Sequence, residues 1–252
     1  MQKIKLTPLL KQYFDIKEKH KECLIFFRLG DFYELFFEDA ETAASILNIT
    51  LTKRGNIEGK DIPMCGVPHH QGENYLARLL KKGFKVAICE QMEKPEDSKR
   101  RGAKEIIKRE VVRIATPGTL TEEKELEEPD NNYLFSFILL DIGIACSWVD
   151  ISTGEVNLKL CENEDSLIST ILDIGPSELL IDNTKDEKNK NFITKIKNIF
   201  SAIITELDKN YYSSEECNKY LRKIYSEELI LKENEVLALG SIIKYIYYTQ
   251  NG

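Results

Sequence analysis

Residues 28–39 read Arg-Leu-Gly-Asp-Phe-Tyr-Glu-Leu-Phe-Phe-Glu-Asp, and they determine the fold of the N-terminal half. They predict a turn at residues 29–31, between an apolar strand over residues 23–28 and a second strand over residues 32–37. A helix is predicted over residues 38–48, because the helix dipole favours acidic residues in a first turn. The sequence therefore predicts a β-hairpin that leads directly into a helix.

The second strand places Phe32 and Glu34 on one face. Side chains alternate along a strand, so these two project the same way, roughly 7 Å apart, and Tyr33 points back into the protein. An aromatic ring in a strand is typical of a hydrophobic core. Phe32, however, lies near a hairpin tip, and Phe is one of the residues that some proteins insert between DNA base steps from the minor groove. Both interpretations stay open on the spacing alone.

Helices and strands alternate through the rest of the chain, which predicts an α/β fold with mixed sheets. A helix begins at Thr7-Pro8, a strand over residues 49–52 ends in a basic turn at Lys53-Arg54-Gly55, and residues 62–70 are predicted as an ordered loop or a short edge strand. The other predicted strands cover residues 85–90, 110–116, 133–140, 144–150, 155–160, 178–181 and 203–206, and the other helices cover residues 72–82, 166–174, 192–200 and much of the chain after residue 214.

Six segments together resemble one known family. They are Gly-Asp-Phe-Tyr-Glu-Leu-Phe (30–36), Leu-Thr-Lys-Arg-Gly (51–55), Ile-Pro-Met-Cys-Gly-Val-Pro-His-His (62–70), Glu-Asn-Tyr-Leu (73–76), Val-Ala-Ile-Cys-Glu-Gln (86–91) and Val-Val-Arg-Ile-Ala-Thr-Pro-Gly-Thr (111–119). In order and spacing they are similar to the mismatch-recognition domain of the MutS family of DNA mismatch repair proteins. The resemblance implies a mixed-sheet recognition domain over residues 1–120, a linker over residues 121–130 and an RNase H-like α/β connector domain over residues 131–252.

The resemblance also implies what the site residues do. Phe32 would enter the minor groove at a mispaired or unpaired base, and Glu34 would hydrogen-bond the displaced base. Because a mispair has already lost part of its stacking, the cost of unstacking, about a few kcal/mol per step, is lower there. Further residues expected near the DNA backbone or groove are Leu29, Asp31, Tyr33, Lys53, Arg54, Met64, Lys108 and Arg109. The sequence departs from some family members at Leu29 and His69, where Met and Tyr are familiar alternatives.

The resemblance further implies partners and a larger protein. Mismatched double-stranded DNA would bind the first domain, while the connector would relay conformational change and dock a MutL-type partner. The full-length family protein is an ATPase that uses ATP and Mg²⁺ and acts as a homodimer. No G-x-x-x-x-G-K-[ST] phosphate loop occurs in this sequence. We therefore expect an N-terminal fragment that is not itself an enzyme and needs no cofactor.

Charge and cysteine usage agree with that interpretation. The chain carries a formal charge of −7, which divides into +4 over residues 1–124 and −11 over residues 125–252. A basic half beside an acidic half is compatible with one part contacting a polyanion. Six scattered cysteines, without a signal peptide or a bilayer-spanning apolar run, predict buried reduced thiols. We expect a cytoplasmic, nucleoid-associated protein with no membrane contact.

Two other classes of function remain possible on the residues alone. A nuclease would need converging carboxylates for metal ions, and the candidates are Asp31, Glu34, Glu38 and Asp39, or Asp141 with Asp150; His69 and His70 have no nucleophile or acid partner at a suitable spacing. No metal site is predicted. A docking module without any DNA contact is the third class, and the acidic C-terminal half favours it.

Overall fold

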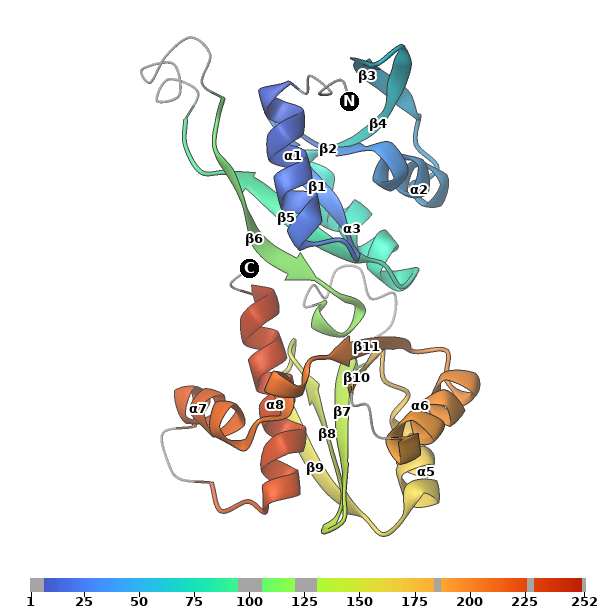
Figure 1. Ribbon diagram of the computed structural model, residues 1–252, viewed down its shortest axis with the longest axis vertical. Helices are drawn as coiled ribbons and strands as arrows, with labels where there is room; N and C mark the ends of the chain where they lie inside the picture. The colour runs from blue at the N-terminus through green and yellow to red at the C-terminus, as the bar shows by residue number, and fades with distance from the viewer. Residues whose placement is uncertain (1–6, 95–105, 121–130, 184–186, 226–228, 251–252) are drawn as a thin grey trace. The chain divides into compact units, whose positions relative to one another are not determined.

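The computed structural model describes residues 7–94, 106–120, 131–183, 187–225 and 229–250. The chain divides into two compact units (Figure 1), unit 1 up to Thr116 and unit 2 over Pro117–Thr249. The predicted linker over residues 121–130 lies outside the described residues. The domain limits at residues 120 and 131 therefore stay a prediction.

Unit 1 is built on a six-stranded mixed sheet in the order β3-β4-β2-β1-β5-β6. Strand β1 pairs in parallel with β5, and every other neighbouring pair is antiparallel. The strands are β1 (Cys23–Leu29), β2 (Phe32–Phe36), β3 (Thr52–Ile57), β4 (Lys60–Pro68), β5 (Lys85–Gln91) and β6 (Arg109–Ala115). The predicted mixed sheet is confirmed.

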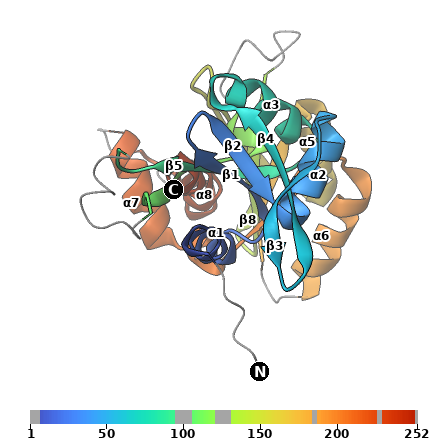
Figure 2. The same ribbon diagram turned by 90° about the horizontal axis from the view of Figure 1, so that it is seen from above.

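Helices cover both faces of this sheet (Figure 2). Helix α1 (Pro8–Lys19) begins at an N-cap, where the Thr7 hydroxyl accepts from the backbone N–H of Leu10 at 3.3 Å. Its Tyr13 packs edge-on against Phe27 and Phe36. The opposite face carries α2 (Phe37–Leu47) and α3 (Gly72–Lys81), with the short 3₁₀ turn η1 (His69–Gln71) before α3. Helices thus pack on both faces of the sheet, whereas β3 is mostly exposed. The side chains of Phe32 and Glu34 lie on the α1 face, the face of Phe27.

Two predictions about residues 49–70 were wrong. The strand begins at Thr52 rather than Ile49, and Lys53-Arg54-Gly55 is part of β3 rather than a turn. Strand β4 has nine residues and lies inside the sheet, between β3 and β2. Proline has no N–H for the ladder, but Pro63 faces Lys53 where the register shifts between Lys53 and Asn56, and Pro68 ends the strand. A bulge and a strand end are places where a sheet tolerates proline.

Unit 2 holds a five-stranded mixed sheet in the order β11-β10-β7-β8-β9. Strands β7, β8 and β9 form an antiparallel meander, whereas β10 is parallel to both β7 and β11. Their bounds are β7 (Tyr133–Leu140), β8 (Gly143–Asp150), β9 (Glu155–Cys161), β10 (Glu178–Asp182) and β11 (Ile203–Leu207). With its flanking helices this sheet confirms the predicted RNase H-like α/β fold.

Alternating residues of β7 fill two cores, one on each side of the sheet. Leu134 and Ile138 face the helices α7 (Ser214–Ile224) and α8 (Glu233–Gln250). Phe135 and Phe137 face α5 (Glu164–Ile174) and α6 (Glu187–Ile199). Figure 1 shows these helix pairs on opposite sides of the sheet. A strand that is apolar on both faces has a continuous hydrophobic sequence, as residues 133–140 do.

The 3₁₀ turn η2 (Pro117–Thr119) belongs to unit 2. Asn132 donates its side-chain amide to the carbonyls of Pro117 at 2.8 Å and Leu120 at 3.2 Å. The buried carboxylate of Glu178 accepts from the backbone N–H of Gly118 at 3.1 Å and from Tyr245 at 2.8 Å. These contacts hold the start of unit 2 against its own sheet.

Candidate nucleic-acid interface

The tip of the hairpin between β1 and β2 consists of Gly30 and Asp31, which are exposed at the surface. Gly30 has φ +59°, a left-handed conformation that glycine adopts without steric cost. The carbonyl of Asp31 accepts from the backbone N–H of His69 at 2.8 Å, which ties the tip to η1. The Asp31 side chain itself is exposed. The tip is therefore a short turn held by the neighbouring chain segment.

Phe32 is the exposed ring of this hairpin. Its side chain is 47% exposed, whereas Tyr33 is 8% and Leu35 is 0% exposed. Along the sheet it lies between Leu29 of β1 and Pro68 of β4. The predicted alternation of faces is confirmed, and the interpretation of Phe32 as a core ring is wrong. Leu29 is half-buried beside Phe32, on the same face.

Tyr33 fixes the strand from the other face. Its ring stacks on Phe26 with centroids 5.3 Å apart and lies 5.2 Å from the ring of His69. Its hydroxyl donates a hydrogen bond to the carboxylate of Glu90 on β5. A Cβ at Gly72 would come within 2.7 Å of this ring, so glycine permits the close approach of α3. Burial, followed by the contact with Glu90, raises the pKa of Tyr33.

Glu34 is paired with Arg54. The Nη1 atom of Arg54 lies 2.7 Å from Oε1 and 2.5 Å from Oε2 of Glu34. The side chain of Glu34 is 13% exposed and that of Arg54 is 45% exposed. Gly66 of β4 lies opposite Glu34, so no side chain stands on the strand between them. The predicted hydrogen-bond acceptor and a predicted phosphate contact are thus brought together.

The predicted basic contacts fall into different environments. Lys53 is exposed and pairs with Asp61 at 2.8 Å, and Lys108 is exposed and pairs with Glu110 at 2.6 Å. Met64 lies half-buried between Phe36 and Thr52 in the register of the sheet, on the face of Glu34. The two lysines remain accessible to a phosphate, because their partners are themselves exposed.

Arg109 is a structural residue rather than an exposed cation. It is 6% exposed, and its guanidinium donates to the carbonyl of Arg28 at 2.6 Å, to Gln12 at 3.1 Å and to the carbonyl of Ile107 at 2.8 Å. The same group lies over the ring of Phe27, 5.0 Å from its centroid. The expectation of a surface phosphate contact at Arg109 does not fit this geometry.

Three of the carboxylates considered for a nuclease, Glu34, Asp39 and Asp150, have structural partners. Asp39 accepts from Tyr13 at 3.0 Å, from Lys17 at 2.8 Å and from the backbone N–H of Ile25 at 3.1 Å. Asp150 accepts from the N–H and hydroxyl of Ser152 at 2.8 and 2.6 Å and so closes a turn. In the described parts of the chain, no three His, Cys, Asp or Glu side chains gather as a metal site.

Sequence reasoning missed Glu90. Its carboxylate joins Tyr33, Arg28 and His69, with Arg28 Nη1 at 3.9 Å and His69 Nε2 at 3.8 Å. Glu90 follows four buried residues of β5, and an acid that continues such a run is a signal for a partnered carboxylate. The group braces the face of β2 opposite Phe32.

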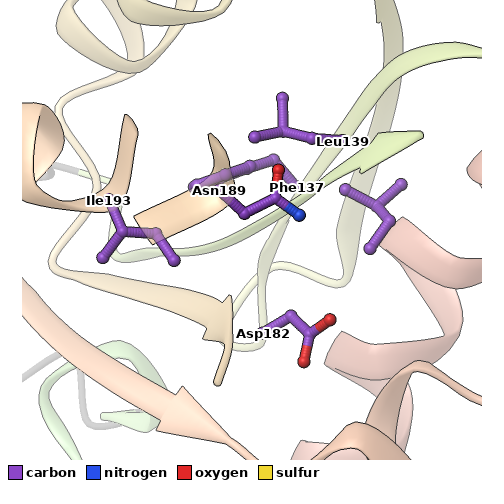
Figure 3. Close-up of a pocket in the computed structure, with 6 residues that line it drawn as sticks. Phe137, Leu139, Asp182, Asn189 and Ile193 are labelled. Atoms are coloured by element: carbon purple, nitrogen blue, oxygen red, sulfur yellow. The ribbon is translucent and has the colours of Figure 1, made fainter. Parts of the chain in front are cut away.

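A small cavity in unit 2 is lined by Phe137, Ile138, Leu139, Asp182, Asn189 and Ile193 (Figure 3). Its volume of about 10 Å³ admits about one water molecule and no base. Burial raises the pKa of Asp182, partly offset by Lys209.

The six cysteines are free and buried, as predicted. None of the helices in the described residues combines the length and apolar character needed to cross a bilayer.

Comparison with known proteins extends over nearly the whole chain. The family model described as MutS domain I matches residues 7–124, and the one described as MutS domain II matches residues 132–252. Proteins named DNA mismatch repair protein MutS are 42% identical over 257 residues in Wolbachia pipientis wMel, 42% over 252 in Anaplasma phagocytophilum (strain HZ) and 41% over 244 in Staphylococcus haemolyticus (strain JCSC1435). These matches cover 97–99% of this chain and 26–30% of the relatives.

The two mixed α/β units are matched in order by the models of MutS domain I and MutS domain II. The chain belongs to the MutS family. It spans about 30% of the length of the first curated relatives it matches.

Proposed function

We propose that this chain recognises mispaired or unpaired bases in duplex DNA, as the first step of mismatch repair, by inserting Phe32 from the minor groove. The observation that carries the proposal is a phenyl ring 47% exposed at the tip of a hairpin whose next residue is 8% exposed. The strand that carries this ring is held by Tyr33, which stacks on Phe26 and donates to Glu90. A ring on such a strand can keep its position against a base stack, whereas a ring on a flexible loop would be displaced.

The selectivity follows from the cost of deforming DNA. Unstacking costs about a few kcal/mol per step, and smooth bending of a site costs roughly 1–6 kcal/mol. A mispair has already lost part of its stacking, so the same insertion costs less there. One ring therefore detects many different errors, which the degenerate minor-groove pattern of donors and acceptors would not permit.

Glu34 supplies the second contact. In the proposal its carboxylate hydrogen-bonds the base displaced by Phe32, which lies on the same face of β2. Where no displaced base is available, the carboxylate gains no hydrogen bond from DNA, and its negative charge, which Arg54 offsets only in part, opposes binding close to the phosphates. The pair therefore combines an insertion that lesions favour with a charge that penalises intact duplex.

Phosphate contacts come from the exposed cations. Lys53 and Lys108 have side chains 67% and 61% exposed, and Arg54 lies beside Glu34. Each phosphate neutralised by a cation releases counterions, so binding should weaken with salt. The basic first half of the sequence, with a charge of +4, agrees with this assignment.

The second unit is proposed to relay conformational change and to dock a MutL-type partner. Its segment of the sequence carries −11, which suits a protein surface better than a phosphate backbone. By membership of the family, we also propose that the chain works within a longer homodimeric protein that uses ATP and Mg²⁺, in the cytoplasm at the nucleoid.

Equilibrium binding of the full gene product tests the proposal. Three duplexes of one length are compared, one fully paired, one with a single mispair and one with a single unpaired base, each in the presence of wild-type protein or Phe32→Ala. We expect wild type to prefer the two defective duplexes and Phe32→Ala to bind all three alike. A wild-type protein without preference, or a variant that keeps it, would overturn the proposal, and absent binding to every duplex would favour a docking module.

A further inference from the structure

We infer that Arg54 determines specificity by exchanging partners: it holds Glu34 in the unbound protein and on paired DNA, and it moves to a backbone phosphate only when Glu34 binds a displaced base. This inference rests on the proposed function. It assigns to Arg54 a role beyond that of an ordinary phosphate contact, because the contact depends on the state of Glu34.

The geometry of the pair supports the exchange. One nitrogen of Arg54, Nη1, reaches both carboxylate oxygens of Glu34, at 2.7 and 2.5 Å. The same oxygens are the acceptors that a base would require. Arg54 and a displaced base therefore compete for the same two oxygens of Glu34, and Glu34 and a phosphate compete for the Nη1 donor of Arg54.

A bulge in β3 aims Arg54 at this position. The register moves from Lys53 opposite Pro63 to Asn56 opposite Asp61, which leaves one extra residue on β3. Gly55 in this segment has φ +75°. Bulges redirect side chains, and here Arg54 turns toward β2 while the neighbouring Lys53 pairs with Asp61. Of these two adjacent cations, Arg54 thus pairs with Glu34 on β2, whereas Lys53 pairs with Asp61.

The surroundings make Arg54 the partner that can move. Its side chain is 45% exposed, whereas that of Glu34 is 13% exposed. Arg109 is a second guanidinium near the pair: burial lowers its pKa most, and smaller effects come from the charges of Cys89, which raises it, Arg54, which lowers it, and Glu34, which raises it. Arg109 is held by three hydrogen bonds and by the ring of Phe27. Arg109 therefore remains near Glu34 when Arg54 departs.

The exchange distinguishes the two kinds of duplex. On paired DNA, transfer of Arg54 to a phosphate would leave Glu34 as an unpaired charge beside the backbone, so the pair stays closed. At a lesion, Glu34 gains the displaced base and Arg54 gains a phosphate. Recognition of the base is thereby converted into one additional backbone contact.

The slope of log K against log salt measures this contact, because one phosphate changes it by about 0.9. The full gene product is titrated with paired and mispaired duplexes as wild type, Arg54→Gln and Glu34→Gln, and Lys53→Gln is the matched control. Thermal unfolding verifies that every variant is folded. We expect Arg54→Gln to reduce the slope by about 0.9 on mispaired DNA and to change it little on paired DNA.

Glu34→Gln should have the opposite signature: it frees Arg54 on both duplexes, so the slope on paired DNA increases toward the mispaired value. Lys53→Gln should change both slopes equally. If wild type prefers mispaired DNA but Arg54→Gln lowers both slopes equally, or neither, the exchange is refuted and the proposed function survives. If wild type shows no preference, the proposed function fails and the exchange fails with it.

Discussion

The hydroxyl of Tyr33 donates a hydrogen bond to the carboxylate of Glu90, and this contact ties the strand that carries Phe32 to β5, two strands away. The ring of Tyr33 also stacks on Phe26, so one side chain is fixed at both its face and its end. Phe32 and Glu34, its neighbours in sequence, face the other way. Tyr33, the next residue of the same strand, therefore holds in place the strand that carries the exposed ring of Phe32.

We predict that Tyr33→Phe lowers the free energy of unfolding. The substitution keeps the ring but removes the Tyr33 donor from the Glu90 carboxylate, a loss of roughly 1–2 kcal/mol for a partly buried hydrogen bond to a charged group. Urea unfolding measures it. Tyr133→Phe is the matched control, because the hydroxyl of Tyr133 donates to Glu155 at 3.1 Å in an exposed position. Equal effects of the two substitutions would show that Tyr33 is no special support.

Glu34→Gln should retain the affinity for mispaired DNA and tighten binding to fully paired DNA. The amide can still hydrogen-bond a displaced base, whereas the repulsion from the phosphates disappears. Parallel titrations give the dissociation constant of the paired duplex divided by that of the mispaired duplex, and this ratio should fall several-fold. An unchanged ratio would mean that Glu34 takes no part in discrimination.

Arg109→Ala should destabilise unit 1 by about 2–4 kcal/mol, because it removes three hydrogen bonds and leaves partly buried acceptors without these donors. Lys108→Ala, at an exposed neighbour, should change the free energy of unfolding by less than about 0.5 kcal/mol. Denaturant unfolding of the two variants checks this. The assignment of Arg109 as structural would be wrong if its variant unfolded like wild type and lost only DNA affinity.

Alkaline pH should destabilise the fold through its buried thiols. Burial raises the pKa of Cys65 to about 11 and that of Cys89 to about 12. The unfolded thiols ionise from a pKa near 9, so above that pH the unfolded chain binds fewer protons than the folded one and stability decreases. At pH 10 the loss is about 1 kcal/mol for Cys65.

Unfolding midpoints at pH 7.5 and pH 10 test this effect, with Cys65→Ala as the comparison. The variant starts from a lower stability, because it lacks the sulfur atom in the core, but it should lose about 1 kcal/mol less between the two pH values than the wild type. An identical pH dependence for both proteins would exclude Cys65 as a contributor.

The sequence predicted the hairpin well because its signals are local. Gly30 marks the turn, and period-two alternation separates Phe32 from Tyr33. For the same reason the segment of β4 was predicted as an ordered loop or a short edge strand, since Pro63, Gly66 and Pro68 are local signals for a loop or an edge. Their place inside the sheet depends on a bulge and a strand end that only the pairing of strands defines.

The contacts of the site depend on that pairing even more strongly. Glu34 and Arg54 are twenty residues apart, and no periodicity relates them. Arg109 follows Lys108 in a basic run that resembles a solvated face, yet the pairing of β6 with β5 brings Arg109 into the interior. The chemistry of a residue was predictable from its type, whereas its partner was not.

The proposed mechanism requires the ring of Phe32 to enter the base stack. A duplex that carries the fluorescent base 2-aminopurine beside a single mispair reports this entry, because stacking quenches the base and unstacking restores its emission. Val112→Ala, which shortens another exposed apolar side chain of unit 1, is the matched control. Saturating wild-type protein and this control should both raise the emission at the mispair but not in a fully paired duplex.

Phe32→Ala at saturation should leave the emission at the mispair unchanged. If the emission rises as much with Phe32→Ala as with wild type, DNA is opened without this ring, and insertion of Phe32 is contradicted as the basis of mismatch recognition.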